Sequence, residues 1–149
     1  MLDQLMDMLY TESVREDEGG AYGVPTQAGL QDYPEEEAQF IVQLPTAPEK
    51  RERMTAIVYQ GIDEICDKGP SAENLQKVKE YVHRSHDENL KKNNYWMSRM
   101  IDHARYGREY VADYDRLVDE ITAADIQQMA KTILRSGNRI EVGMTSPVE

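Results

Sequence analysis

Two short segments of alternating apolar and polar residues stand between an opening helical segment and a long helical tract, and this order constrains the fold most. Residues 22–30 and 38–44 repeat with a period of two, which predicts two strands joined by a turn at the glutamates 35–37. Pro25 places the first strand at an edge or a bulge. The expected inner face of the second strand consists of Ala38, Phe40, Val42 and Leu44.

The remaining segments carry apolar residues at helical spacing. The opening segment predicts an amphipathic helix that runs to the glycines at 19 and 20, with Leu2, Leu5, Met6 and Leu9 on its buried face. Five more helical segments, including a short one around Leu117, are expected between residues 46 and 134. Their start and stop signals are Thr46, Gly69-Pro70, Ser71, Asn93-Asn94, Gly107, Thr122 and Gly137. Residues 140–144 alternate again and predict a final strand.

Grouped strands and grouped helices predict an α+β fold, with the helices packed on one face of a small antiparallel or mixed sheet. The length of 149 residues suits one domain over 1–149 and no second domain. Three strands are few for this many helices, so we expect an incomplete sheet that belongs to something larger. A free sheet edge also predicts pairing with a second copy, as a homodimer.

The charge and the cysteine content exclude several classes of function. A formal charge of −11 disfavours binding to nucleic acid or to an anionic membrane, and no apolar run is long enough to span a bilayer. The single cysteine, Cys66, excludes an intrachain disulfide and a zinc site built from cysteines. No histidine neighbours it in the sequence, so a nucleophilic role is not favoured.

The histidines give a weak signal for a metal. His83 and His86 are three residues apart on a predicted helix and could bind one metal ion together, but no third ligand is evident. The sequence H-R-S-H-D matches neither zincin helix, H-E-x-x-H or H-x-x-E-H, so we expect a solvated helix face there and no metal. His103 is expected to be half-buried. Residues 91–96 form a small basic and aromatic patch, but the acidic charge of the rest of the chain disfavours binding of nucleic acid there.

Residues 14–24 hold the strongest candidate site. Arg15 lies at the end of a predicted helix and Tyr22 at the start of a predicted strand, with Gly19 and Gly20 between them. The glycines let the backbone turn sharply and leave space for a ligand. A guanidinium and a phenol that face one cleft can hold a carbonyl or stabilise developing negative charge. In the alternative interpretation, Arg15 pairs with a nearby glutamate and Tyr22 belongs to the core.

This segment, R-E-D-E-G-G-A-Y-G-V, resembles the R-E-x-x-G-x-x-Y-x-V segment in the C-terminal half of pitrilysin/insulinase-type zinc metallopeptidases, the inverzincins. Three later pieces resemble the same family in the same order: Gly69-Pro70 followed by E-N-L-Q-K-V-K, then K-N-N-Y-W-M, then I-T-A-A-D-I-Q-Q-M-A-K-T-I-L. The resemblance covers nearly the whole chain.

The resemblance implies a LuxS/metallohydrolase-like peptidase half that is incomplete at its N-terminus. Such enzymes close two homologous halves around a peptide, and the N-terminal half binds zinc through H-x-x-E-H and a later glutamate. By resemblance, Tyr22 would donate a hydrogen bond to the scissile carbonyl or its oxyanion, and Arg15 would orient the substrate. Gly19 and Gly20 would contact the substrate. Zinc is expected in the N-terminal half, which would be the partner of this chain.

The sequence departs from the family because H-x-x-E-H is absent, so the chain alone cannot form the zinc-bound nucleophile and is expected to be inactive. The leading hypothesis is the C-terminal, substrate-binding portion of a zinc metalloendopeptidase that hydrolyses peptides. One alternative is a non-catalytic homologue that acts as an assembly or partner subunit; another is an acidic α+β interaction domain with accidental matches. The compartment is left open, since a bacterial periplasmic parent would carry its signal peptide upstream.

Overall fold

A computed structural model describes residues 1–16, 23–31, 33–109 and 111–144. The opening helix and the hairpin are α1 (Leu2–Glu16), β1 (Thr26–Gln31) and β2 (Glu37–Val42). A 3₁₀ turn, η1 (Pro48–Lys50), leads into the helical tract of α2 (Arg51–Lys68), α3 (Ala72–Asn89), α4 (Asn93–Tyr106), α5 (Tyr114–Glu120) and α6 (Ala123–Leu134).

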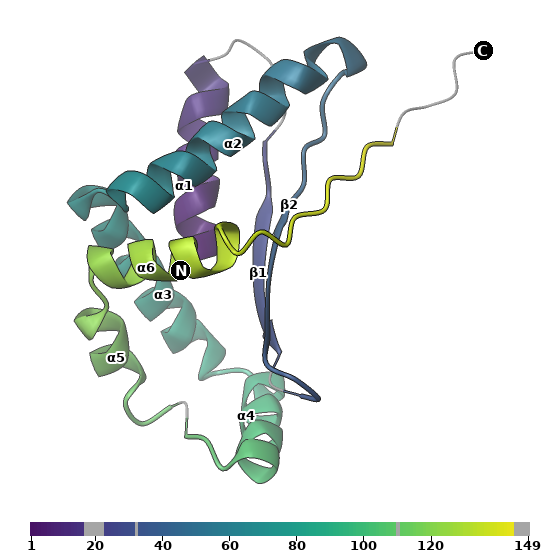
Figure 1. Cartoon of the computed structure of the whole chain (residues 1–149). Helices are drawn as coiled ribbons and strands as arrows, with labels where there is room; N and C mark the ends of the chain where they lie inside the picture. The colour runs from purple at the N-terminus through teal and green to yellow at the C-terminus, as the bar shows by residue number, and fades with distance from the viewer. Residues whose placement is uncertain (17–22, 32, 110, 145–149) are drawn as a thin grey trace.

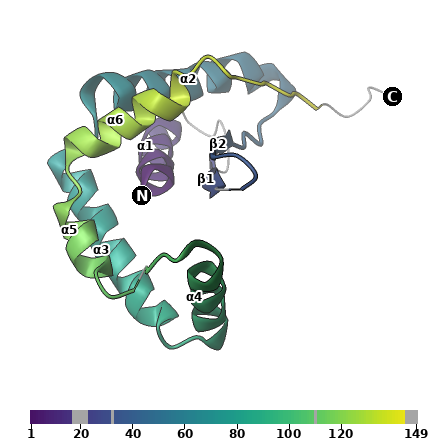
Figure 2. The same ribbon diagram turned by 60° about the horizontal axis from the view of Figure 1, so that its bottom comes forward.

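The two strands form an antiparallel hairpin, in which Thr26 pairs with Val42 and Gln31 pairs with Glu37. Helices α1, α2 and α6 lie on one side of this hairpin (Figure 1). Helix α2 packs against both α1 and α6, and α3 packs against α1 and α5. Figure 2 shows the tract from α2 to α4 as an arc around α1 and the hairpin. The predicted α+β fold, with helices on one face of a small sheet, is confirmed.

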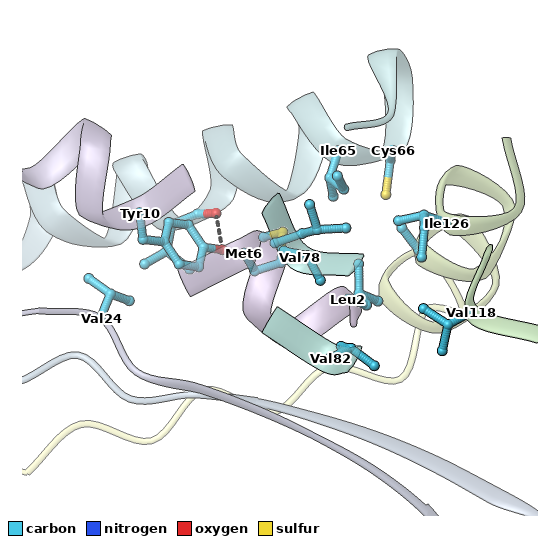
Figure 3. Packing of buried hydrophobic residues seen from close by; sticks show 13 residues of the cluster. Leu2, Met6, Tyr10, Val24, Ile65, Cys66, Val78, Val82, Val118 and Ile126 are labelled. Carbon is cyan, nitrogen blue, oxygen red and sulfur yellow. Dashed lines mark hydrogen bonds between the residues drawn. The ribbon is translucent and has the colours of Figure 1, made fainter. Parts of the chain in front are cut away.

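A close contact in the core joins α1 to α2. The ring of Tyr10 is fully buried, and its hydroxyl donates a hydrogen bond of 3.0 Å to the carbonyl oxygen of Val58 (Figure 3). Burial raises the pKa of the Tyr10 phenol. A Cβ atom at Gly61 would lie 2.5 Å from Cε1 of Tyr10, so only glycine leaves room for the ring. The predicted buried face of α1 is confirmed. The prediction did not include Tyr10, which belongs to the same core.

The helix ends follow local sequence signals closely. The Ser71 hydroxyl accepts a 3.1 Å hydrogen bond from the Asn74 amide, and Thr122 forms a reciprocal capping box with Asp125. Gly107 ends α4 in the left-handed conformation. Thr46 is the exception, because α2 begins at Arg51 after η1 and has no side-chain cap. None of the helices in the described ranges is long and apolar enough to cross a membrane.

The predicted final strand is wrong. Residues 140–144 form no strand in the structure, and the apolar side chains Ile140, Val142 and Met144 are between 79% and 94% exposed. Polar side chains hold this end of the chain against Tyr59 of α2 instead. Glu141 accepts a 3.0 Å hydrogen bond from the Tyr59 hydroxyl, and the guanidinium carbon of Arg139 lies 4.6 Å from the centroid of the Tyr59 ring. The segment therefore lies along a helix, and the described sheet has two strands.

The hairpin has an inner face and an open face. Phe40, Val42 and Leu44 pack against the core as predicted, whereas Ala38, which was expected on the same face, is exposed because the core ends before this end of the hairpin. On β1, inward packing ends early: Val24, just before the strand, is buried, whereas Ala28 and Leu30 are exposed. Ile41 of β2 is also exposed. The described part of the chain thus leaves apolar hairpin residues without a covering layer.

We expect Gly61→Ala to lower the free energy of unfolding by about 1–3 kcal/mol, because the new methyl group would overlap the Tyr10 ring. Chemical denaturation followed by circular dichroism measures the change. Gly29→Ala is the matched control, since nothing lies within 4 Å of a Cβ at that position. Equal stability of the two variants would contradict the packing of Tyr10 on Gly61.

Candidate functional site

The candidate segment 15–22 lies mostly outside the described residues. Helix α1 ends at Glu16, and the next residue that the structure describes is Gly23. The side chain of Arg15, and all of Gly19, Gly20 and Tyr22, fall in the part that is not described. The roles predicted for these residues therefore stay predictions, and the structure informs them through the two flanks of the segment.

Both flanks are held to each other by Thr26 and Asp7. The Thr26 amide donates a 2.7 Å hydrogen bond to Oδ1 of Asp7, and the Thr26 hydroxyl lies 2.8 Å from that oxygen and from the Asp3 carbonyl oxygen. Val24 is buried in the same cluster as Met6 and Tyr10. The start of β1 thus lies against α1, and the segment that contains Arg15 and Tyr22 joins two elements fixed side by side.

A second polar cluster links α3 to α5 through His83. Its Nδ1 lies 2.7 Å from Oδ1 of Asp115, and its Nε2 lies 2.9 Å from Oδ1 of Asp119. A neutral imidazole has only one N–H, so only the protonated ring can donate to both carboxylates. The hydrogen bonds to Asp115 and then Asp119 raise the His83 pKa. The sequence spacing on α3 predicted neither partner, because both carboxylates lie on another helix.

His86 is buried, so the expected solvated face is wrong at this position. Its ring stacks on Tyr114 with the centroids 3.9 Å apart, and its Nδ1 lies 3.3 Å from the Tyr95 hydroxyl. The position is buried because α5 and the start of α4 cover this end of α3 with aromatic rings. Burial also raises the pKa of the Tyr114 phenol.

His83 and His86 therefore have separate partners. Among the residues that the structure describes, no group of three or more His, Cys, Asp and Glu side chains could hold a metal ion. The described part of the chain does not fit a zinc centre, and we assign it no step of zinc chemistry.

The other sequence candidates offer no reactive group. Cys66 is buried in the last turn of α2, and burial raises the pKa of its thiol, which opposes thiolate formation. His103 is exposed and not half-buried as expected; its Nδ1 lies 3.4 Å from the Arg108 carbonyl oxygen. The neighbouring apolar residues Met100 and Ile101 also face solvent, so this part of α4 has no cover for His103.

We expect the His83 cluster to make stability depend on pH. The His83 pKa is raised in the folded state, so its stabilising contribution is complete below the unfolded histidine pKa of about 6.5 and is lost as the pH rises through the folded value. Denaturation of the wild type and of His83→Gln across this range measures the difference. His103→Gln is the control, and a stability gap between wild type and His83→Gln that does not shrink with rising pH would contradict the assignment.

Comparison with known proteins places this geometry in a family. The model of the peptidase M16 inactive domain matches residues 2–82, from α1 into α3. No curated protein sequence matches the chain closely enough to count as a relative.

Three solved structures share the fold. The periplasmic protease PqqL from Escherichia coli is 15% identical with a TM-score of 0.71, over 90% of this chain and 15% of that one. A mutant of the ferredoxin protease FusC, solved in complex with Arabidopsis ferredoxin, is 19% identical with a TM-score of 0.69, over 87% of this chain and 14% of that one. A peptidase M16 inactive domain from Pseudomonas fluorescens is 19% identical with a TM-score of 0.70, over 89% and 33%.

This chain thus spans between 14% and 33% of the structures that it matches. The family model covers more than half of the chain and includes both Arg15 and Tyr22. The resemblance to pitrilysin-type peptidases is confirmed, and the chain belongs to the peptidase M16 family, as a part of its inactive-type C-terminal domain.

Proposed function

We propose that this chain is the substrate-binding portion of a zinc metalloendopeptidase whose zinc site lies in another half of the molecule. The family match over residues 2–82 carries the proposal, because it includes the segment of Arg15 and Tyr22. The hydrogen bonds of Thr26 to Asp7 support it, since they hold both flanks of that segment in one place. A peptide site needs such anchoring to keep its donors in position.

In this proposal, the Tyr22 hydroxyl donates a hydrogen bond to the scissile carbonyl oxygen and to the oxyanion that forms from it. Arg15 orients the substrate or the tyrosine, and Gly19 and Gly20 let the peptide backbone approach. A donor aimed at the oxyanion stabilises the transition state more than the ground state, which raises the turnover rate. Zinc and the general base are supplied by the N-terminal half.

The open surfaces of the hairpin support the proposal that the parent enzyme supplies further strands to this sheet. Leu30 and Ile41 are exposed, and the alternating residues 140–144 run extended without a ladder partner in the described part of the chain. Further strands from the same half of the parent enzyme, the ones that the resemblance expects before this chain, would pair with the hairpin edge and cover these side chains. FusC has been solved with a bound protein, and we propose a polypeptide substrate for this chain as well.

In a full-length parent enzyme, we expect Tyr22→Phe to lower kcat by about 10²–10³-fold and to leave KM nearly unchanged, because only the oxyanion contact is lost. Steady-state hydrolysis of a fluorogenic peptide measures both constants. Tyr33→Phe, which removes the hydroxyl from an exposed tyrosine in the hairpin turn, is the matched control. An unchanged kcat for Tyr22→Phe would remove this role from Tyr22.

The source of the zinc chemistry is tested separately. We expect the 149-residue chain with added zinc to hydrolyse no peptide, and a mixture with its zinc-binding half to do so. Binding between the two without hydrolysis would favour the alternative of a non-catalytic partner subunit.

The unpaired edges also predict a homodimer when the chain is studied alone, since a second copy is the only available strand donor. Light scattering coupled to size exclusion measures the mass. A monomer at all concentrations would show that the edges do not pair with each other.

A further inference from the structure

Helix α4 turns a mostly polar face toward the rest of the chain and an apolar face toward solvent. A helix that packs on its own domain shows the opposite arrangement. The residues partly covered by the rest of the chain are Tyr95, Arg99 and Asp102, which share one face of the helix. No residue of α4 is buried. Figure 2 shows the helix standing apart from α1, α2 and α6, at the end of the arc that begins with α2.

The opposite face of α4 is apolar and open. Met97, Met100, Ile101 and Ala104 follow the spacing of i, i+3, i+4 and i+7, which is typical of a helix face that packs against another surface. Met97, Met100 and Ile101 are nevertheless 54%, 64% and 43% exposed. We call these four residues the α4 stripe.

The α4 stripe lies within the basic part of an acidic chain. Residues 91–109 carry five basic side chains against two acidic ones, whereas the whole chain carries 17 against 28. Arg105 follows Ile101 by four residues and flanks the stripe, and Lys91 and Lys92 precede the helix; all three are exposed. The apolar surface is therefore rimmed by positive charge.

We propose that the α4 stripe is a docking surface for an acidic polypeptide segment that carries its own apolar side chains. The apolar stripe provides the area to be buried, and the basic rim selects a partner of opposite charge. This surface is separate from the segment of Arg15 and Tyr22, so the inference goes beyond the proposed function and does not depend on it.

Charge decides against two other occupants. A symmetric contact between the stripes of two copies would bring the two basic rims together, and like charges at an interface oppose association. An anionic membrane is an extended surface, so it would be repelled by the whole field of a chain with a formal charge of −11. A short acidic segment would contact only the basic rim of the stripe.

Trp96, the single tryptophan of the chain, lies on α4 next to the stripe and reports binding directly. The probes are three synthetic helical 16-residue peptides with the same leucine stripe and with Glu, Gln or Lys at the other positions. We expect the Glu peptide to shift Trp96 emission to shorter wavelength and to bind at least about tenfold more tightly than the Gln peptide, with affinity falling as salt rises. Equal binding of the three peptides would overturn the proposal.

Variants locate the binding surface. Met100→Glu places a negative charge within the stripe and is expected to reduce binding of the Glu peptide by at least about tenfold, while circular dichroism stays unchanged because Met100 is exposed. Met129→Glu is the matched control, an exposed methionine on α6. Equal losses in the two variants would overturn the assignment to α4.

Two further results would replace the acidic segment with another occupant. A Trp96 shift with phosphatidylglycerol vesicles but not with the Glu peptide would identify a membrane surface. A concentration-dependent Trp96 shift without any peptide, abolished by Met100→Glu, would identify a second copy. Either result would overturn the proposal.

Discussion

The packing of Tyr10 on Gly61 is the contact on which the rest of the structure depends. It brings α1 against α2 over a position that has no side chain, and the tyrosine hydroxyl then bonds to the Val58 carbonyl oxygen of the same helix. Helix α1 carries Asp7, which in turn holds Thr26 and the start of β1. The hairpin and the two described flanks of the candidate segment are thus connected to this helix–helix contact through α1.

Helix α2 serves as a platform for the other end of the chain as well. Helix α6 packs on it, and Glu141 attaches the C-terminal extended segment to its Tyr59. Helices α3 and α5 are joined through His83 and His86, whose ring contacts add a polar and aromatic link beside the apolar core, against which Tyr114 also packs. Helix α4 follows this link, and none of its residues is buried.

Three surfaces remain open in the described part of the chain: the outer face of the hairpin, the residues 140–144 and the α4 stripe. The chain spans between 14% and 33% of the three solved structures described above, and in the proposed function further strands of the parent enzyme cover the first two surfaces. The α4 stripe differs from these, because its basic rim indicates a partner by charge and not by strand pairing.

The sequence by itself determined the helix ends and the family, because these depend on neighbours in the chain: Ser71 with Asn74, Thr122 with Asp125, and the spacing of Arg15 and Tyr22. It also determined the alternation of β2, since strand periodicity is local, but not that Ala38 on the predicted inner face would lie beyond the core and be exposed. Only the tertiary structure decided that His86 is buried, that His83 meets two carboxylates of α5, that residues 140–144 lie on a helix and form no strand, and that the apolar face of α4 points outward. Each of these depends on which distant segment lies nearby, and periodicity shows that a face is apolar without showing what covers it.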